Sequence, residues 1–375
     1  MHGYFHILDA KNQGAPLSRK RFQPADPAFD VEVQGSAAIS NGCVYFGTTD
    51  EFYCLGKYAK VKTELPKQPS MPRANPSGKP SLLQVIPAEV TLRSGETVRL
   101  QGKLFDAQGQ FIKSTPISLE LSAMQRGPGI GEDVVLPNLQ GELNGSSFTA
   151  PNIGGGQSGT LLAKADGLTA RVRVRQVPSL PYKEDFESTG VGTIPKGWTN
   201  TQLRFVTTKL DDGNTVLMKT ASIAVPFYRQ WYGFIGTPDM SGYTISADVM
   251  GQKVRENLPN MGVTAHRYIL QLVGNEQKLR VSAWDAVPRI AKQIDFPWEP
   301  GSWYHLKLTV QVKDGKGLIL GKAWKKGQAE PTDWSIELSD DTPNLSGPSG
   351  IYGSAMGIQP PNPGTPIFYD NITLK

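Results

Sequence analysis

The sequence has few cysteines, few histidines and no long apolar run. Cys43 and Cys54 are the only cysteines among the 375 residues, and they fit neither a disulfide framework nor a metal-binding spacing. The 4 histidines do not gather beside carboxylates, which disfavours a zinc-dependent hydrolase. No stretch approaches the roughly 18 apolar residues that span a bilayer. What remains is a globular composition, with 38% hydrophobic and 19% charged residues.

Glycine and proline are abundant, with 40 and 29 copies. These numbers are typical of many short strands joined by tight turns, so the sequence predicts an all-β protein. A length of 375 residues favours two or three domains. The net charge of +5 comes from dispersed basic residues, and the basic strand from Arg171 to Arg175 lacks interleaved aromatic residues. We therefore expect no nucleic-acid partner.

The first sixty residues read as strands separated by turns. GYFHILDAKNQG (3–14) predicts one strand and a turn, and GSAAISNGCVYFGTTDEFYCLG (35–56) predicts two strands around the hairpin signal Asn41-Gly42. The order of ILDAKNQG and SAAISNGCVYFGTTDEFYCL resembles the repeat of PQQ-type β-propellers, although Glu51 replaces the usual turn glycine. The resemblance implies that residues 1–60 are the last one to two blades of a propeller.

Sixty residues hold about one and a half four-stranded repeats, which cannot close a ring. Either Met1 lies inside a longer propeller, which we favour, or this segment packs on the rest of the chain. No PQQ site is predicted, because most of a propeller is absent from these residues. Cys43 and Cys54 fall on neighbouring strands but not opposite each other, so we expect free, buried thiols.

Residues 61–81 are rich in proline, with five prolines in KTELPKQPSMPRANPSGKPS (62–81), and predict an extended linker. Residues 82–178 alternate apolar and polar positions in short strands, which predicts a β-sandwich. Four segments there resemble bacterial Ig-like modules: PAEVTLRSGETVRL, LFDAQGQFI, LNGSSFTAP and GTLLAKADGLTARVRV. The resemblance implies a spacer without chemistry of its own.

Residues 179–375 contain many strand candidates and no convincing amphipathic helix, which predicts a two-sheet jelly roll. Alternation is clearest in WYHLKLTVQV (303–312), where one face holds Tyr304, Leu306, Leu308 and Val310 and the other holds Trp303, His305, Lys307 and Thr309. The run from YKEDFES through YTISADV and GKAW to FYDNITL resembles a concanavalin A-like, LamG-like jelly roll of planctomycete-like bacteria. It also resembles the jelly roll of 3-keto-disaccharide hydrolases. We expect the first and last strands to pair.

All 7 tryptophans lie at or after Trp198. Sugar sites combine flat aromatic faces with polar side chains that bind hydroxyl groups. We predict that carbohydrate is bound by Trp231, Arg267, Gln271 and Trp284. Strand alternation already indicates that the wider set of aromatic and polar candidates cannot all share one face. The alternative, in which these tryptophans pack in the core, stays open.

Three acidic residues suggest a structural calcium ion. Asp185 and Glu187 lie two apart on the first strand of the module, hence on the same face, and Asp370 lies on the last strand. If these strands pair, the carboxylates can meet, and Ca²⁺ prefers such oxygen ligands. Solvated carboxylates on an edge strand are the alternative.

Catalytic patterns are not found in the sequence. No strand carries the E-x-D-x-x-E pattern of laminarinase-like jelly rolls, and there is no G-x-S-x-G elbow. We therefore predict a non-catalytic binding or scaffold protein of the bacterial envelope, periplasmic, cell-surface or secreted, whose partners are glycans or other envelope proteins. Two alternatives remain. One is a fragment of a carbohydrate-active or quinone-dependent enzyme whose catalytic part is missing or unrecognised. The other is an adhesion or assembly protein without a small ligand.

Overall fold

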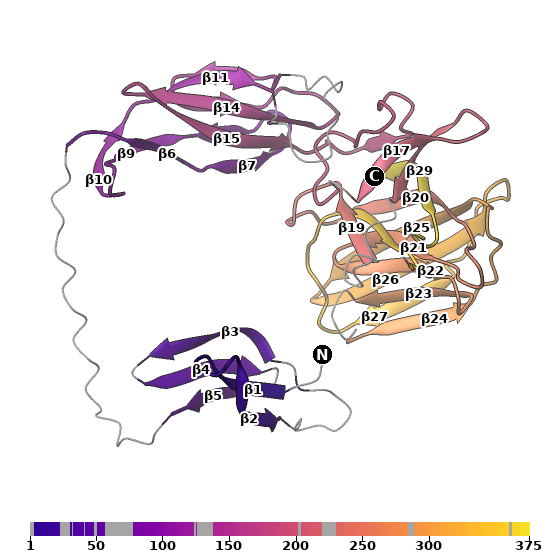
Figure 1. Ribbon diagram of the computed structural model, residues 1–375. Coiled ribbons are helices and arrows are strands. Elements are labelled where there is room, and N and C mark those ends of the chain that lie inside the picture. The colour runs from indigo at the N-terminus through magenta and orange to yellow at the C-terminus, as the bar shows by residue number, and fades with distance from the viewer. Residues whose placement is uncertain are drawn as a thin grey trace. The chain divides into compact units, whose positions relative to one another are not determined.

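The computed structural model describes residues 4–22, 31, 33–40, 42–48, 51–56, 78–123, 125, 138–201, 204–219, 230–283, 289–359 and 362–375. All named elements in these ranges are β-strands, so the all-β prediction is confirmed. Within the same ranges, no helix has the length and apolar character needed to cross a membrane. The chain forms two compact units, Met1–Arg73 and Ala74–Lys375 (Figure 1).

The first unit contains two small antiparallel sheets. β1 (Tyr4–Asp9) pairs with β2 (Ala15–Arg21), and β4 (Cys43–Thr48) pairs on its two sides with β3 (Val33–Ser40) and β5 (Phe52–Leu55). Aromatic rings join the two sheets, and the rings of Phe5 and Phe46 stack with their centroids 4.3 Å apart. The predicted hairpin forms, because Ser40 pairs with Cys43 and Gly42 has a φ of 74°. Asn41 itself lies outside the described residues.

The propeller prediction is wrong for this unit. A propeller blade is one four-stranded sheet, whereas the described residues form separate sheets of two and three strands. Cys43 and Cys54 are free, and Cys54 pairs with Tyr45 rather than with Cys43, as predicted. The prediction that they are buried is wrong: Cys43 is half-buried and Cys54 is exposed. Strand alternation gives the inner face of β4 to Val44 and Phe46, so the thiols lie on the outer face.

Most of the predicted linker at 61–81 lies outside the described residues. The strands of the first part of the second unit pack around one apolar core that includes Leu104, Phe148 and Leu161. They form three sheets, ordered β10-β9-β6, β11-β14-β15-β7 and β12-β13-β8. The strands are β6 (Leu82–Ile86), β7 (Glu89–Leu92), β8 (Thr97–Arg99), β9 (Gln101–Phe105), β10 (Phe111–Thr115), β11 (Ser118–Ser122), β12 (Glu142–Asn144), β13 (Ser147–Thr149), β14 (Gln157–Ala165) and β15 (Leu168–Gln176). The Ig-like assignment of this part stays a prediction.

The second part of this unit is a sandwich of two antiparallel sheets. The large sheet has the order β17-β18-β29-β20-β25-β26-β27, with β16 also paired to β29, and the small sheet has the order β19-β28-β21-β22-β23-β24. In the large sheet, the strands are β16 (Tyr182–Glu184), β17 (Phe205–Lys209), β18 (Thr215–Lys219), β20 (Thr244–Gly251), β25 (Tyr304–Lys313), β26 (Lys316–Lys325), β27 (Ile336–Asp340) and β29 (Ile367–Leu374). In the small sheet they are β19 (Gln230–Phe234), β21 (Asn260–Ala265), β22 (Tyr268–Val273), β23 (Lys278–Ala283), β24 (Ala291–Asp295) and β28 (Gly350–Ser354).

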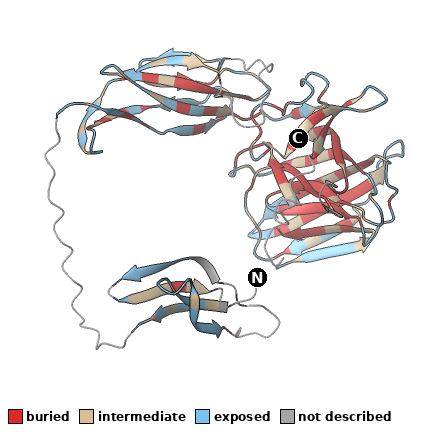
Figure 2. Cartoon of the chain, viewed as in Figure 1, coloured by how far each residue is buried: buried red, intermediate tan, exposed pale blue. Residues whose placement is uncertain are grey.

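The core of this sandwich lies between the two sheets, as the buried residues in Figure 2 show. Leu306 and Leu308 of β25 and Leu270 of β22 are among its fully buried side chains. The chain crosses repeatedly from one sheet to the other, and the first strand pairs with the last, with Tyr182 opposite Leu374. The predictions of a two-sheet jelly roll and of the pairing of its end strands are therefore confirmed.

A two-residue turn between β21 and β22 carries backbone strain that a substitution can relieve. Arg267 in this turn is exposed and has a φ of 64°, a conformation that costs a non-glycine residue about 1 kcal/mol. We expect Arg267→Gly to raise the free energy of unfolding by about 1 kcal/mol in urea titrations. The control is Arg280→Gly in strand β23, which should lower it. An unchanged or lower stability of Arg267→Gly would contradict the prediction.

Candidate functional site

The outer face of the large sheet carries a row of aromatic side chains. On β25 the residues Tyr304, Leu306 and Leu308 point into the core, so alternation sends Trp303 and His305 outward. Trp324 of β26 lies directly opposite His305, and the two rings stack with centroids 5.0 Å apart and an interplanar angle of 29°.

Trp334, which precedes β27, extends this row. We call Trp303, His305, Trp324 and Trp334 the tryptophan face. All four side chains are half-buried, so each is held by neighbours and keeps part of its ring in contact with solvent. Packing on one side and exposure on the other give a rigid, partly apolar surface.

Two lysines fix the tryptophan rings. The Lys322 ammonium lies 4.8 Å from the ring centroid of Trp334 and 6.0 Å from that of Trp324, and it contacts the Glu330 carboxylate at 2.8 Å. The Lys322 side chain is only 7% exposed, so its cation–π contacts are shielded from water and each contributes on the order of 2 kcal/mol. Lys326 lies 5.6 Å above the ring of Trp303.

A buried carboxylate lies beneath the face. Asp248 of β20 is fully buried and contacts the His305 ring and the Lys326 ammonium, the latter at 2.8 Å. Burial acts to raise the pKa of Asp248, but the bonds from His305 and Lys326 outweigh it and hold this pKa below its usual value. The charged carboxylate therefore anchors the histidine and the lysine from below.

A second buried carboxylate, Asp370 of β29, lies opposite Asp248. The amide nitrogen of Asn371 donates to both, at 3.0 Å to Asp248 and 2.9 Å to Asp370, and Asn214 donates to Asp370 at 3.1 Å. Asn371 has a φ of 47°, which asparagine tolerates, at a register shift between β20 and β29. Burial raises the pKa of Asp370.

This arrangement suits binding better than hydrolysis. The exposed parts of the rings offer flat apolar surfaces, and the Lys326 side chain, 42% exposed, offers hydrogen-bond donors. Sugars present both an apolar ring face and hydroxyl groups to such a surface. The two carboxylates beneath are buried and occupied by internal donors, so neither presents an oxygen to a molecule on the face.

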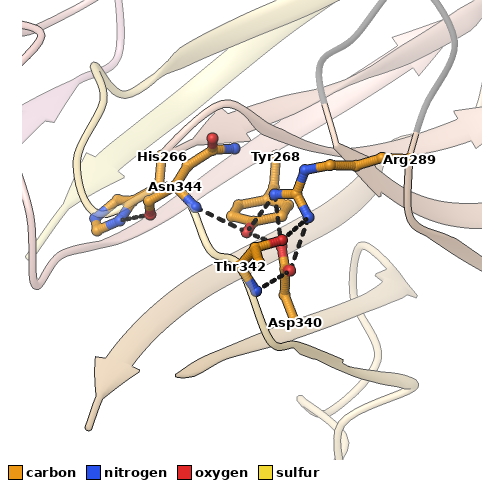
Figure 3. Close-up of polar contacts among 6 residues, drawn as sticks. All are labelled: His266, Tyr268, Arg289, Asp340, Thr342 and Asn344. Carbon is orange, nitrogen blue, oxygen red and sulfur yellow. Dashed lines mark hydrogen bonds and ion pairs between the residues drawn. The ribbon is translucent and has the colours of Figure 1, made fainter. Parts of the chain in front are cut away.

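At another place in the sandwich, a buried polar cluster joins its two sheets. Arg289 makes two contacts of 2.7 Å with Asp340, and the Tyr268 hydroxyl donates to the same carboxylate (Figure 3). The backbone nitrogen of Thr342 donates to the Asp340 carboxylate, and that of Asn344 donates to the Tyr268 hydroxyl. The bond from Arg289 lowers the pKa of Asp340 to about 2. Because its polar groups are paired internally, we interpret the cluster as structural.

The predicted carbohydrate-binding residues do not come together. Gln271 is buried on the outer face of the small sheet, Trp231 packs toward the core at the edge of that sheet, and Arg267 is exposed in a turn. Trp284 lies outside the described residues. Whether these four residues bind carbohydrate stays a prediction.

Of the predicted calcium ligands, Asp370 lies on β29 as expected, but Asp185 and Glu187 lie beyond β16, which ends at Glu184. The backbone nitrogen of Thr215 donates to Glu187 at 2.9 Å. Asp185 is 48% exposed and lies 4.0 Å from Lys183. Phe186 between the two acidic residues has a φ of 61°, which breaks the strand alternation that the prediction assumed. Among the described residues, no group of three or more His, Cys, Asp or Glu side chains is placed to hold a metal ion.

Sequence reasoning missed the tryptophan face, although its signal was present. WYHLKLTVQV was correctly divided into an inner and an outer face, and the outer face begins with Trp303 and His305. What the pattern could not show is that Trp324, nineteen residues beyond His305, pairs with it across the strands.

Comparison with known proteins gives structural neighbours but no family. No family model and no curated protein matches the chain. A carbohydrate-binding module from Bacillus subtilis matches 48% of this chain and 95% of its own, with 12% identity and a TM-score of 0.32. Winged bean acidic lectin, solved with methyl-alpha-D-galactose, matches 51% of this chain and 98% of its own, with 7% identity and a TM-score of 0.25.

A bifunctional protein from Bacteroides eggerthii matches 100% of this chain and 44% of its own, with 11% identity and a TM-score of 0.30. These similarities are too low to carry an argument about function. The resemblance to PQQ-type propeller proteins is not supported, because no family model matches the chain and the described residues of the first unit form sheets of two and three strands.

The polar cluster of Figure 3 makes a prediction about stability at acid pH. The pKa of Asp340 is lower in the folded protein than in the unfolded chain, where it is about 3.9. Its contribution is therefore complete above about pH 4 and is lost as the pH falls toward 2. We expect Asp340→Asn to lower the unfolding free energy by about 1–3 kcal/mol at pH 7, because a neutral amide cannot replace the charged hydrogen bonds that the carboxylate makes with Tyr268 and with Arg289, whose side chain is 35% exposed.

Denaturant titrations at pH 7 and pH 3 measure the loss of stability in Asp340→Asn and its dependence on pH. The difference between wild type and Asp340→Asn should shrink at pH 3. The control is Asp341→Asn, at an exposed neighbour whose side chain is 84% exposed. A variant as stable as wild type at pH 7, or a difference that does not change with pH, would refute this role of the cluster.

Proposed function

We propose that this protein is a non-catalytic carbohydrate-binding protein that holds sugar on the tryptophan face of its C-terminal sandwich. The observation that carries the proposal is the set of three half-buried tryptophans and one histidine on the outer face of one sheet. Isolated exposed aromatics are common on proteins, but four rings held together by Lys322, Lys326 and a buried aspartate form an ordered surface.

The charges of the face support an uncharged or weakly charged ligand. Lys322 and Lys326 each have a carboxylate partner, Glu330 and Asp248, so neither cation is left for a strongly anionic ligand. The exposed donors of Lys326 and the His305 ring suit hydroxyl groups, since sugar hydroxyls accept and donate single hydrogen bonds. A location in the envelope or outside the cell, where polysaccharides are found, is part of the proposal.

The first test is binding to soluble polysaccharides. Laminarin, xylan, galactomannan and pectin, screened with the whole chain by affinity electrophoresis and then calorimetry, cover neutral and acidic backbones. We expect at least one neutral polysaccharide to bind. Trp324→Ala should then weaken binding about tenfold or more, because truncation of a central tryptophan in a binding surface costs on the order of 2 kcal/mol.

Two variants accompany this test. Trp334→Ala should also weaken binding, and it leaves the stacking of Trp324 on His305 in place. Phe111→Ala removes a 50% exposed aromatic side chain from another part of the chain and should bind like wild type. Equal affinity for wild type, Trp324→Ala and Trp334→Ala would exclude this face as the site, and the absence of any polysaccharide binding would overturn the proposed function.

A further inference from the structure

The two cysteines of the chain lie on one face of the three-stranded sheet in the first unit. Cys43 is the first residue of β4, and Cys54 belongs to the neighbouring strand β5 (Figure 1). Val44 and Phe46 face the apolar core, so alternation sends Cys43 and Tyr45 to the outer face. Cys54 is directly opposite Tyr45, which puts its thiol on the same face.

The Cys43 sulfur leans across the sheet toward β5. A Cβ atom on Gly56, which lies two residues beyond Cys54, would be 2.5 Å from the Cys43 Sγ atom. The sulfur therefore fills the space that a side chain at this glycine would need. A hydrogen bond joins the side chains of Cys43 and Cys54 and raises the pKa of Cys43, and the Tyr45 hydroxyl is hydrogen-bonded to Cys54. The two thiols thus meet across the strands.

The diagonal placement of the two cysteines disfavours a disulfide. Diagonal neighbours on adjacent strands have Cα atoms about 7–8 Å apart, whereas a disulfide needs Cα atoms within about 7 Å. Both thiols are free. A single atom between the sulfurs removes the mismatch, because two metal–sulfur bonds of about 2.3 Å span more than one sulfur–sulfur bond of about 2 Å.

The ligands on this face select the kind of ion. Thiolate sulfur is a soft ligand that suits Cu(I) and Zn²⁺, whereas Ca²⁺ and Mg²⁺ need oxygen. Structural zinc takes four protein ligands, but in the described part of the chain no group of three or more His, Cys, Asp or Glu side chains is placed to hold a metal ion. Cu(I) differs from zinc because it is soft and forms stable complexes with only two thiolates.

An ion can reach this pair from solvent. Cys54 is exposed, while Cys43 is half-buried. The rings of Tyr45 and Phe52 stack on the same face with centroids 6.4 Å apart, and the Phe52 side chain is itself 73% exposed. The exposed thiol offers a first contact, and the half-buried one holds the ion against the sheet.

We propose that Cys43 and Cys54 form a two-thiolate site for Cu(I), with the ion held between β4 and β5 on the outer face of the sheet. On binding, each thiol releases its proton and each sulfur forms one bond to the ion, whose oxidation state does not change. The site belongs to the first unit and shares no residue with the tryptophan face of the second, so this proposal does not rest on the proposed function.

The experiment titrates the whole, reduced chain with Cu(I) under nitrogen, against the competing chromophore bicinchoninate. We expect one Cu(I) per chain, no retention of Zn²⁺ at the same concentration, and the same elution volume in gel filtration before and after loading. The affinity should rise with pH, because the raised pKa of Cys43 keeps this thiol protonated at neutral pH, where protons compete with the ion.

Cys43→Ser and Cys54→Ser each remove one sulfur. Each should weaken Cu(I) binding about a hundredfold or more, because a neutral hydroxyl is a poor ligand for a soft ion. Cys54→Ser changes an exposed position and provides the test if Cys43→Ser does not fold. The matched control is Ser40→Ala, at an exposed residue directly opposite Cys43 on β3, which should bind Cu(I) like wild type.

The outcomes separate the parts of the proposal. An affinity within about threefold of wild type in either cysteine variant would overturn the site. Zn²⁺ bound as tightly as Cu(I) would overturn the choice of ion, and dimerisation on loading would overturn the pairing of both sulfurs within one chain. Trp324→Ala should bind Cu(I) like wild type, and the cysteine variants should keep polysaccharide binding, so failure of this site and failure of the proposed function are distinguishable.

Discussion

The pairing of strand β29 with β18 and β20 is the constraint on which the sandwich and its tryptophan face depend. The last strand of the chain lies inside the large sheet, and the first strand of the sandwich, β16, also pairs with it. Its inward residues Ile367 and Tyr369 complete the core and adjoin Lys219, while the outward Asp370 lies beneath the tryptophan face. Because side chains alternate along a strand, a shift of one residue in this pairing would exchange the two sets.

The buried charged groups of this sandwich have two kinds of surroundings. Asp248 and Asp340 are buried, but each has cationic partners, so their ionised forms are stabilised. Lys219 is equally buried, its ammonium has no hydrogen-bond partner among the described residues, and burial, more than the charge of Arg204, lowers its pKa.

Local pattern predicted much of the fold correctly. The alternation in WYHLKLTVQV placed Tyr304 and Leu306 in the core and Trp303 and His305 outside, and the end strands were expected to pair. The same kind of reasoning failed in the first sixty residues, where strands and turns were predicted well but their assembly into propeller blades was wrong. A run of about twenty residues fixes hairpins, because turns are local, but not the number of strands that join a sheet.

By itself, the sequence determined the all-β class, the hairpins and the inner and outer faces of individual strands, because these follow from side-chain alternation and turn residues within a few positions. The tertiary structure alone decided which faces meet. It separated Trp231 from Gln271, placed Trp324 against His305, and enclosed Lys219 opposite Gly353. The physical reason is that these contacts depend on sheet order and register between strands far apart in the chain, which no local pattern specifies.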